Sequence, residues 1–519
     1  MIVRNGKTTH LIGRDISYIM FENEDGDLLN FHFGKKIADI DYSQMKEEWE
    51  EKWGFVSNRF CLDNYPQEYP SDLRNPAYQV VNKFGNAVSR LVVKEYIIHN
   101  ECAVQTDGMP CLFNKNKKAD TLEVVLYDEI IDLEVHLYYT VFDEYNIIAR
   151  HTVIINKSDS DIKLLSAYSA SIDLPMDNYE MIHFAGSWGR ERAMHRTKLE
   201  MGMKAEVENA RGGSGHQLNP FSMITSVGAD ETHGEVYGFL LVYSGNHSTV
   251  AKIDQFGNLR VQQGINPHQF EWILGPNESF CTPQSVICYS DSGIGAMTRE
   301  YHDVIRNNLM RSKWVNKKRP ILINNWEGTY FDFTEEKLLQ MAEKAHQAGI
   351  ELFVLDDGWF GKRNNDTCSL GDWKVNYDKL PSGIDGLAEK INKIGMKFGL
   401  WFEPEMISPD SDLYREHPDW AIHIDEREGV QSRNQMVLDL SRDEVCEYVI
   451  NAVSNILANA NIEYVKWDMN RQLTDMPRLG YNHEYTLGYY KIMSAIMDGT
   501  YDYNEELKLE IYNAINKDL

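Results

Sequence analysis

Long hydrophobic runs and paired cysteines are both missing from this sequence. No stretch of about 18 consecutive apolar residues occurs, so we expect no membrane-spanning helix. The first residues, MIVRNGKTTHLIGRD, lack the apolar core of a signal peptide. The seven cysteines are scattered, and none forms a C-x-x-C pair, a pattern typical of reduced thiols in a cytosolic protein. We therefore expect a soluble protein in the cytoplasm.

Basic residues are scarce relative to acidic ones. The chain has 52 lysines and arginines against 79 aspartates and glutamates, a formal net charge of −27. This balance argues against binding to nucleic acid, whose phosphates need a basic surface, and against an anionic membrane surface. A neutral small substrate meets neither objection. With 519 residues, of which 43% are hydrophobic, the chain is long enough for two or three domains with substantial cores.

Helical periodicity is nearly absent before residue 295. That half contains short apolar runs separated by acidic or asparagine-containing turns, and in the segment DLEVHL (132–137) polar and apolar residues alternate. Alternation with a period of two is typical of half-buried antiparallel strands. Many such strands predict a large β-sandwich domain over residues 1–295.

The pattern changes near Gly293. The segment GIGAMTREYHDVIRNNLMRSKW has apolar residues at helical spacing, and we assign its residues 296–315 to a linker helix. Strand-like and helix-like segments then alternate: RPILINNWE, TEEKLLQMAEKAHQAGI, ELFVLDDGW, GIDGLAEKINKIGM, KFGLWFEPEM, RDEVCEYVINAVSNILANA and IEYVKWDMN. Such alternation implies parallel strands joined by helical crossovers, so we expect residues 316–519 to form a second, α/β domain.

Each strand-like segment ends on polar or aromatic residues, which favours a site at the carboxyl ends of the strands. Both a (β/α)₈ barrel and a doubly wound sheet place ligands there. No G-x-G-x-x-G or G-x-x-x-x-G-K-[ST] motif follows any of these strands, so nucleotide binding lacks its usual signal. We therefore prefer the barrel.

The strand-end residues combine indole rings with carboxylates. They are Trp326, Trp359, Trp401, Asp356, Asp357, Glu403, Glu405 and Asp468. Sugar rings offer apolar C–H faces that lie against indoles, and hydroxyls that donate to carboxylates. This combination indicates a carbohydrate site, although it is not unique to sugars.

Asp468 lies between Lys466 and Asn470, at spacings that put all three on one side of a strand. A nearby ammonium favours the ionised carboxylate, which can act as a glycosidase nucleophile. An ordinary lysine–aspartate pair at a strand end is the equally weighted alternative. Asp356 and Asp357 could instead form a solvated acidic turn. Adjacent carboxylates can also hold a divalent metal, but no nearby histidine has ligand spacing, so we expect no metal and no cofactor.

Six segments together resemble the α-galactosidases of glycoside hydrolase family 36: PQEYP, RGGSGHQLNP, LDDGWFGKR, GMKFGLWFEPEMISPDSDLYREHPDW, SRNQMVLDLSR and YVKWDMNR. The resemblance extends from about residue 10 to about residue 490. It implies an N-terminal β-supersandwich, a (β/α)₈ catalytic barrel and a small C-terminal β domain. It also implies removal of terminal α-1,6-linked galactose from melibiose, raffinose and stachyose, with retention of the anomeric configuration.

The resemblance also implies roles for individual residues. Asp468 would be the nucleophile, and Asp356 and Asp357 would hold the galactose O4 and O6 hydroxyls. The other hydroxyls would bind three further polar side chains, namely Lys466, Arg433 and Asn470.

Four more residues complete the implied pocket. Trp326 and Trp401 would line it. Trp188, in FAGSWGRER, would reach in from the sandwich domain, although by itself it reads as a core or turn tryptophan. Asp63 would be contributed across a subunit interface, because many members of the family are tetramers.

The sequence departs from the family pattern after Asp468. Retaining hydrolysis needs a second carboxyl group as acid/base. In the family this group lies in a Cys-Ser-Gly-Gly-Gly-Arg-Phe-Asp segment, which the sequence does not contain, so the acid/base is not found. Only 51 residues follow Asp468, so we expect an incomplete barrel. Three functions follow: an α-galactosidase with impaired hydrolysis, an inactive galactoside-binding protein, or a galactosyltransferase of the raffinose-synthase type.

A parallel sheet that lacks strands exposes apolar faces and an unpaired edge. We therefore predict that this polypeptide is less stable than its longer relatives, or that it associates with itself. Light scattering combined with scanning calorimetry tests this expectation. A monomer with a single cooperative transition well above about 65 °C would contradict it.

Overall fold

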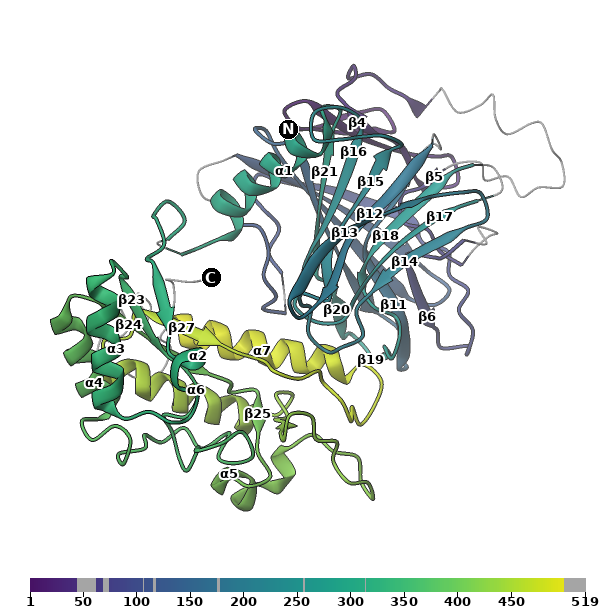
Figure 1. Cartoon of the computed structure of the whole chain (residues 1–519). Coiled ribbons are helices and arrows are strands. Elements are labelled where there is room, and N and C mark those ends of the chain that lie inside the picture. Colours follow the sequence, from purple (N-terminus) through teal and green to yellow (C-terminus); the bar gives the residue numbers. More distant parts are fainter. Residues whose placement is uncertain are drawn as a thin grey trace. The chain divides into compact units, whose positions relative to one another are not determined.

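The computed structural model describes residues 1–43, 62–68, 74–105, 107–114, 118–174, 178–254, 257–312 and 314–498. The chain divides into two compact units, Met1–Leu309 (unit 1) and Met310–Leu519 (unit 2), both drawn in Figure 1. Cys61 and the segment 499–519 lie outside the described residues.

Unit 1 is built from three antiparallel sheets, as the alternating pattern predicts. The largest has the order β13-β12-β15-β16-β21-β10-β9-β8-β7, with β20 paired to β10. Its strands are β7 (Val92–His99), β8 (Ala119–Asp128), β9 (Leu133–Phe142), β10 (Ile147–Asn156), β12 (Tyr179–Ser187), β13 (Arg190–Lys198), β15 (Leu218–Ser226), β16 (Val236–Val242), β20 (Ser279–Cys281) and β21 (Gln284–Ser290).

The other two sheets have five and six strands. The five-stranded sheet runs in chain order: β1 (Ile2–Asn5), β2 (Thr8–Ile12), β3 (Ile16–Glu22), β4 (Leu28–Lys35) and β5 (Leu62–Asp63). The six-stranded sheet contains β6 (Tyr78–Val81), β11 (Ile162–Leu174), β14 (Lys204–Glu208), β17 (His247–Ile253), β18 (Leu259–Ile265) and β19 (Trp272–Leu274).

The helix after the last strand of unit 1 packs on that unit. It comprises α1 (Gly293–Val304) and a π-helical continuation, η2 (Ile305–Leu309). Met297 and Tyr301 are buried in the same core as Val286 and Cys288 of β21, and the Tyr301 hydroxyl donates to the Val286 carbonyl (2.9 Å). The segment that we assigned to a linker therefore includes residues of the unit 1 core.

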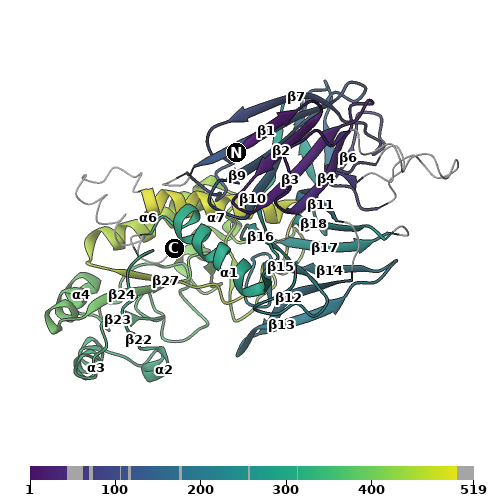
Figure 2. The same ribbon diagram turned by 90° about the horizontal axis from the view of Figure 1, so that it is seen from above.

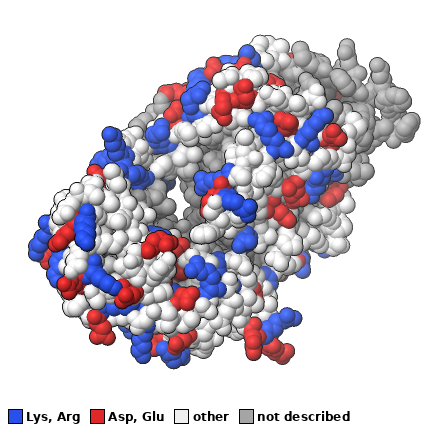
Figure 3. All heavy atoms as spheres, in the orientation of Figure 1, with Lys and Arg blue, Asp and Glu red and all other residues white. Residues whose placement is uncertain are grey.

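Basic and acidic side chains lie interspersed on the face shown in Figure 3. Within the described residues, every helix is too short or too polar to cross a membrane.

Unit 2 contains a parallel sheet in which the strands follow chain order, as in a (β/α)₈ barrel. The order is β22 (Leu322–Asn324), β23 (Leu352–Leu355), β24 (Lys397–Phe402) and β27 (Tyr464–Trp467), all labelled in Figure 2. A separate antiparallel pair is formed by β25 (Met406–Ile407) and β26 (Met436–Val437). The combination of a β-sandwich and a parallel α/β barrel sheet confirms the predicted fold class.

Three helices lie at the predicted places between these strands: α3 (Glu335–Gln347), α4 (Gly383–Ile394) and α6 (Asp443–Asn459). Four helical elements were not expected from the sequence: α2 (Trp326–Thr329), α5 (Asp412–Glu416), the 3₁₀ turn η3 (Pro418–Trp420) and α7 (Tyr481–Asp498). Thr334 is the N-cap of α3, because its side chain accepts from the Lys337 amide (3.3 Å). Gly349 adopts a positive φ of 87° just after the helix, a conformation that favours glycine.

Helix α7 contacts the strand ends through one buried carboxyl group. Glu405, which follows β24, is 5% exposed, and it accepts from Trp467 Nε1 (2.9 Å) and from the Tyr485 hydroxyl of α7 (2.8 Å). Burial raises the pKa of Glu405, while these two hydrogen bonds act to lower it. The contact fixes α7 against β27, whose last residue is Trp467.

We predict that Tyr485→Phe lowers the free energy of unfolding by about 1–3 kcal/mol, because Glu405 loses a buried hydrogen bond. Tyr489→Phe is the matched control. Tyr489 lies one turn further along α7, and its hydroxyl makes no hydrogen bond within the described residues. Urea unfolding followed by tryptophan fluorescence compares the two variants, and equal effects would contradict the assigned role of the Tyr485 hydroxyl.

Candidate active site

The carboxyl ends of the four parallel strands bring together most of the predicted site residues. Asn324 ends β22, Asp356 follows β23, Trp401 lies near the end of β24, and Asp468 follows β27. In a parallel sheet these ends meet at one edge, so residues more than a hundred positions apart in the chain become neighbours.

Asp468 is held by three uncharged donors. Trp401 Nε1 and Asn470 Nδ2 each donate to its Oδ2 at 2.9 Å, and the Met469 amide donates to Oδ1 at 3.0 Å. Lys466 Nζ lies 3.8 Å from Oδ2. The Asp468 side chain is 27% exposed, so a substrate can reach it. A fixed, accessible carboxylate is what nucleophilic attack on a sugar requires.

Lys466 forms its closer ion pair with Asp356. Its Nζ lies 2.9 Å from Asp356 Oδ2, nearer than to Asp468, and the same oxygen accepts from Asn324 Nδ2 (2.5 Å). Burial acts to lower the pKa of Lys466, but the charge of Asp356 and its hydrogen bond outweigh burial and raise it. Lys466 therefore stays protonated, and it links the tips of β23 and β27.

Asp357 has its own cation. Arg363 donates to both carboxylate oxygens, with Nε at 3.0 Å from Oδ1 and Nη2 at 2.8 Å from Oδ2. Asp356 and Asp357 are 3% and 6% exposed, so the alternative of a solvated acidic turn is wrong. Burial raises the pKa of Asp357 in spite of the guanidinium.

Glu403 is the most deeply buried acid of the site, at 2% exposure. Its Oε1 accepts from the Asn470 amide (2.6 Å) and from Gln435 Nε2 (3.2 Å). Burial, followed by the charge of Asp468, raises the pKa of Glu403 to about 7. Two carboxyl groups with such different environments are typical of catalytic sites.

Arg433 joins the site from the loop before β26. Its Nη1 donates to Asn470 Oδ1 at 2.6 Å, so Asn470 connects Arg433 to Asp468. Arg433 and Asn434 have φ values of 54° and 60°, an uncommon left-handed conformation for residues with side chains. Such backbone strain occurs often at functional sites.

The predicted tryptophans occupy different environments. Trp326, partly buried, has its ring edge-on to Tyr330 and Phe331, beside the end of β22. Trp401 is 1% exposed and meets the site through its indole N–H. Trp359, expected at the strand ends, is fully buried in the core of unit 2.

Two predicted site residues belong to unit 1. Trp188 is 88% exposed and lies in the turn between β12 and β13, so of the alternative as a core or turn tryptophan the turn is confirmed and the core position is wrong. Asp63 lies in β5, which pairs with β4, and it is only 4% exposed. Neither residue is among the strand-end residues of unit 2.

Three partners of the site were not singled out from the sequence. Asn325 accepts the Asp356 amide through its side chain (2.7 Å), Arg363 neutralises Asp357, and Gln435 donates to Glu403. All three lie inside segments quoted for the family resemblance or for the strand ends. The sequence signal was present, but the pairing depends on contacts between separate strands.

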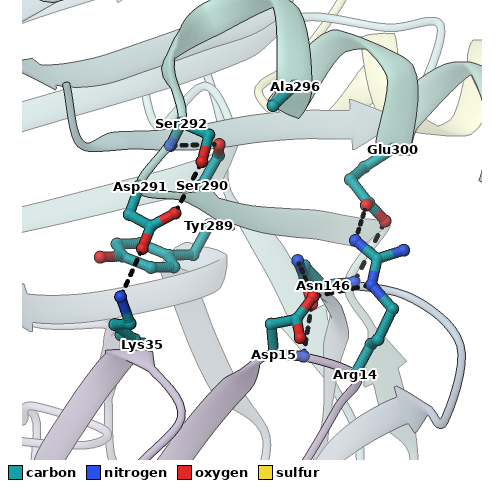
Figure 4. Close-up of a pocket in the computed structure, with 10 residues that line it drawn as sticks. All are labelled: Arg14, Asp15, Lys35, Asn146, Tyr289, Ser290, Asp291, Ser292, Ala296 and Glu300. Carbon is teal, nitrogen blue, oxygen red and sulfur yellow. Dashed lines mark hydrogen bonds and ion pairs between the residues drawn. The ribbon is translucent and has the colours of Figure 1, made fainter. Parts of the chain in front are cut away.

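A polar cavity in unit 1 is the competing candidate. It has a volume of about 310 Å³, and Figure 4 shows charged side chains directed toward one another across it. Lys35 pairs with Asp291 at 2.9 Å, and Arg14 pairs with both Asp15 and Glu300. Because these charged side chains are paired with each other, the cavity has fewer charged groups available to bind a ligand than the strand ends of unit 2 have.

Comparisons with known proteins agree with this assignment. Residues 279–508 match the Melibiase family model, and residues 26–275 match the model of the glycosyl hydrolase family 36 N-terminal domain. The chain is 45% identical to α-galactosidase AgaA of Geobacillus stearothermophilus over 507 residues, which cover 94% of this chain and 69% of AgaA. It is 41% identical to the bifunctional α-galactosidase/sucrose kinase AgaSK of Mediterraneibacter gnavus, covering 92% of this chain and 52% of that protein.

Solved structures give the same result. A variant of AgaA from Geobacillus stearothermophilus in complex with raffinose superposes with a TM-score of 0.91 at 44% identity, covering 95% of this chain and 71% of that one. The galactosidase domain of AgaSK gives a TM-score of 0.92 at 38% identity, covering 97% and 71%.

The pairing of Arg363 with Asp357 makes a direct prediction. Arg363→Met should lower the free energy of unfolding by about 3–5 kcal/mol, because it leaves a buried charge without a partner. Adding Asp357→Asn to this variant should restore part of the loss, because the uncompensated charge disappears. Urea unfolding of the two variants measures both effects. A double variant no more stable than Arg363→Met alone would contradict this electrostatic explanation.

Proposed function

Because the chain belongs to glycoside hydrolase family 36, we propose that it is a retaining α-galactosidase that acts on terminal α-1,6-linked galactose in raffinose-type oligosaccharides. One observation carries the assignment to this site: an accessible carboxylate, Asp468, is fixed by Trp401 and Asn470 at the end of β27. The inactive binding protein and the transferase receive no comparable support, since the relatives compared above are named α-galactosidases.

In the proposed reaction Asp468 attacks the anomeric carbon. Its Oδ2 accepts from both Trp401 and Asn470, whereas Oδ1 accepts a single amide hydrogen. Oδ1 therefore keeps a free lone pair for the attack. The leaving oxygen departs with the bonding electrons and takes a proton from an acid/base group that we do not assign to a residue of this chain.

The buried carboxylates of the site bind rather than react. Asp356 and Asp357 would accept hydrogen bonds from the galactose O4 and O6 hydroxyls, because each carboxylate lies beside a cation, Lys466 for Asp356 and Arg363 for Asp357. Ionised acceptors make the stronger hydrogen bonds to hydroxyls.

The remaining sugar contacts come from the rim of the site. Lys466, Arg433 and Asn470 would bind other hydroxyls, while Trp326 and Trp401 would line the pocket. Trp188, at 88% exposure, is free to contribute an indole face from unit 1. No cofactor enters this scheme.

Assembly and location are also proposals. We infer a homo-oligomer, with a tetramer as the family would suggest, and a place in the cytoplasm. Six described cysteines carry free thiols, which suits a reducing compartment. Asp63 is buried, so it could reach the site of a neighbouring subunit only after a rearrangement that exposes it.

The proposal predicts a covalent intermediate. After incubation with dinitrophenyl α-galactoside, whose leaving group needs little protonation, the intact protein should gain the mass of one hexosyl unit on Asp468, released by azide. Asp468→Asn should abolish both label and turnover, whereas Asp443→Asn, an exposed carboxylate at the start of α6, should retain them. Turnover without lasting label would mean that another carboxyl group supplies the acid/base. If the unaltered chain shows no label and no turnover, the proposal is overturned.

A further inference from the structure

Glu403 and Asp468 share one partner, Asn470. The backbone N–H of Asn470 donates to Glu403 Oε1 at 2.6 Å, and its side-chain Nδ2 donates to Asp468 Oδ2 at 2.9 Å. Trp401, two residues before Glu403 in β24, donates to the same oxygen of Asp468. Glu403 follows the last residue of β24, and Asn470 connects its carboxyl group to that of Asp468.

The charges around Glu403 are mostly negative. Asp468 and Asp357 act on it from the tips of β27 and β23, and both raise its pKa after the larger effect of burial. Its direct hydrogen-bond partners, Gln435 and Asn470, are neutral. The nearby cations have other partners, since Arg363 is paired with Asp357 and Lys466 with Asp356.

Resting on the proposed role of Asp468, we propose that Glu403 is the charge partner of the nucleophile. It holds the one proton that the two carboxyl groups share near neutral pH, leaves Asp468 ionised for attack, and releases that proton to solvent when Asp468 becomes a neutral ester. Glu403 acts through Asp468 and Asn470, so it is a positioning residue rather than a catalytic one.

Burial decides which group holds the proton. Two carboxylates in close proximity do not both ionise readily, and they titrate as a pair. Glu403 is 2% exposed, whereas the Asp468 side chain is 27% exposed, so the negative charge costs less on Asp468. Burial therefore favours the protonated form of Glu403.

The attack reverses this balance. An Asp468 oxygen bonds to the anomeric carbon, the bond to the aryl oxygen breaks, and dinitrophenolate leaves with the electron pair. The charge of Asp468 disappears in the ester, so the pKa of Glu403 falls and its proton passes to water. The new carboxylate then faces the positive charge that develops on the sugar when the ester is cleaved.

Infrared titration tests the coupling without any turnover. The C=O band of protonated Glu403, identified by its loss in Glu403→Gln, should titrate with a midpoint near 7. In Asp468→Asn the midpoint of the Glu403 titration should fall by about one pH unit or more, because the negative charge of Asp468 is removed. Glu405→Gln is the matched control: Glu405 is also buried, but its hydrogen bonds go to Trp467 and Tyr485. It should leave the midpoint unchanged. An unshifted midpoint in Asp468→Asn overturns the inference.

Proton release tests the chemistry. At pH 7 dinitrophenolate leaves as an anion, so the substitution itself neither takes up nor releases a proton. A pH indicator should report a fraction of one proton released for each Asp468 labelled in the unaltered chain and in Glu405→Gln, and none in Glu403→Gln. Labelling without proton release in the unaltered chain overturns the inference. Absence of label counts against the proposed function instead, and the infrared shift then decides by itself whether Glu403 is coupled to Asp468.

Discussion

The parallel register between β24 and β27 is the constraint on which the site depends. It pairs Trp401 with Lys466 and Phe402 with Trp467, and the Asp468 amide extends the ladder by donating to the Phe402 carbonyl (2.8 Å). This alignment brings the indole N–H of Trp401 to Asp468. A slip of one residue would turn every side chain at the tip to the opposite face of the sheet.

Around that register the site separates two kinds of carboxylate. The buried ones have charged or multiple partners: Asp357 has Arg363, and Asp356 has Lys466. Asp468 is more exposed, and its closest donors are neutral. They orient the carboxylate without a cation in direct contact with it. The difference suits a division between binding and attack, because a nucleophile must keep its negative charge available.

Much of the fold followed from local pattern. The alternation in the segment 132–137 predicted β9, and the segment TEEKLLQMAEKAHQAGI predicted α3, because side-chain periodicity depends on neighbouring residues. Pattern alone misplaced two features. Trp359 follows the polar end of β23, like the site residues, yet it is packed in the core, and the helix near Gly293 packs on unit 1. Both outcomes depend on which surface an apolar side chain meets, and spacing does not specify that surface.

The sequence by itself determined the family, the two-part architecture and the identity of the strand-end residues, because motifs and periodicity are properties of consecutive positions. Only the tertiary structure decided the partners. Lys466 stands two residues from Asp468 in the chain, yet it lies nearer to Asp356, 110 residues away. Glu403 looked like one acid among several until its burial and its link to Asn470 set it apart. Pairing and burial arise from the packing of separate strands, and therefore from the three-dimensional arrangement of the strand ends.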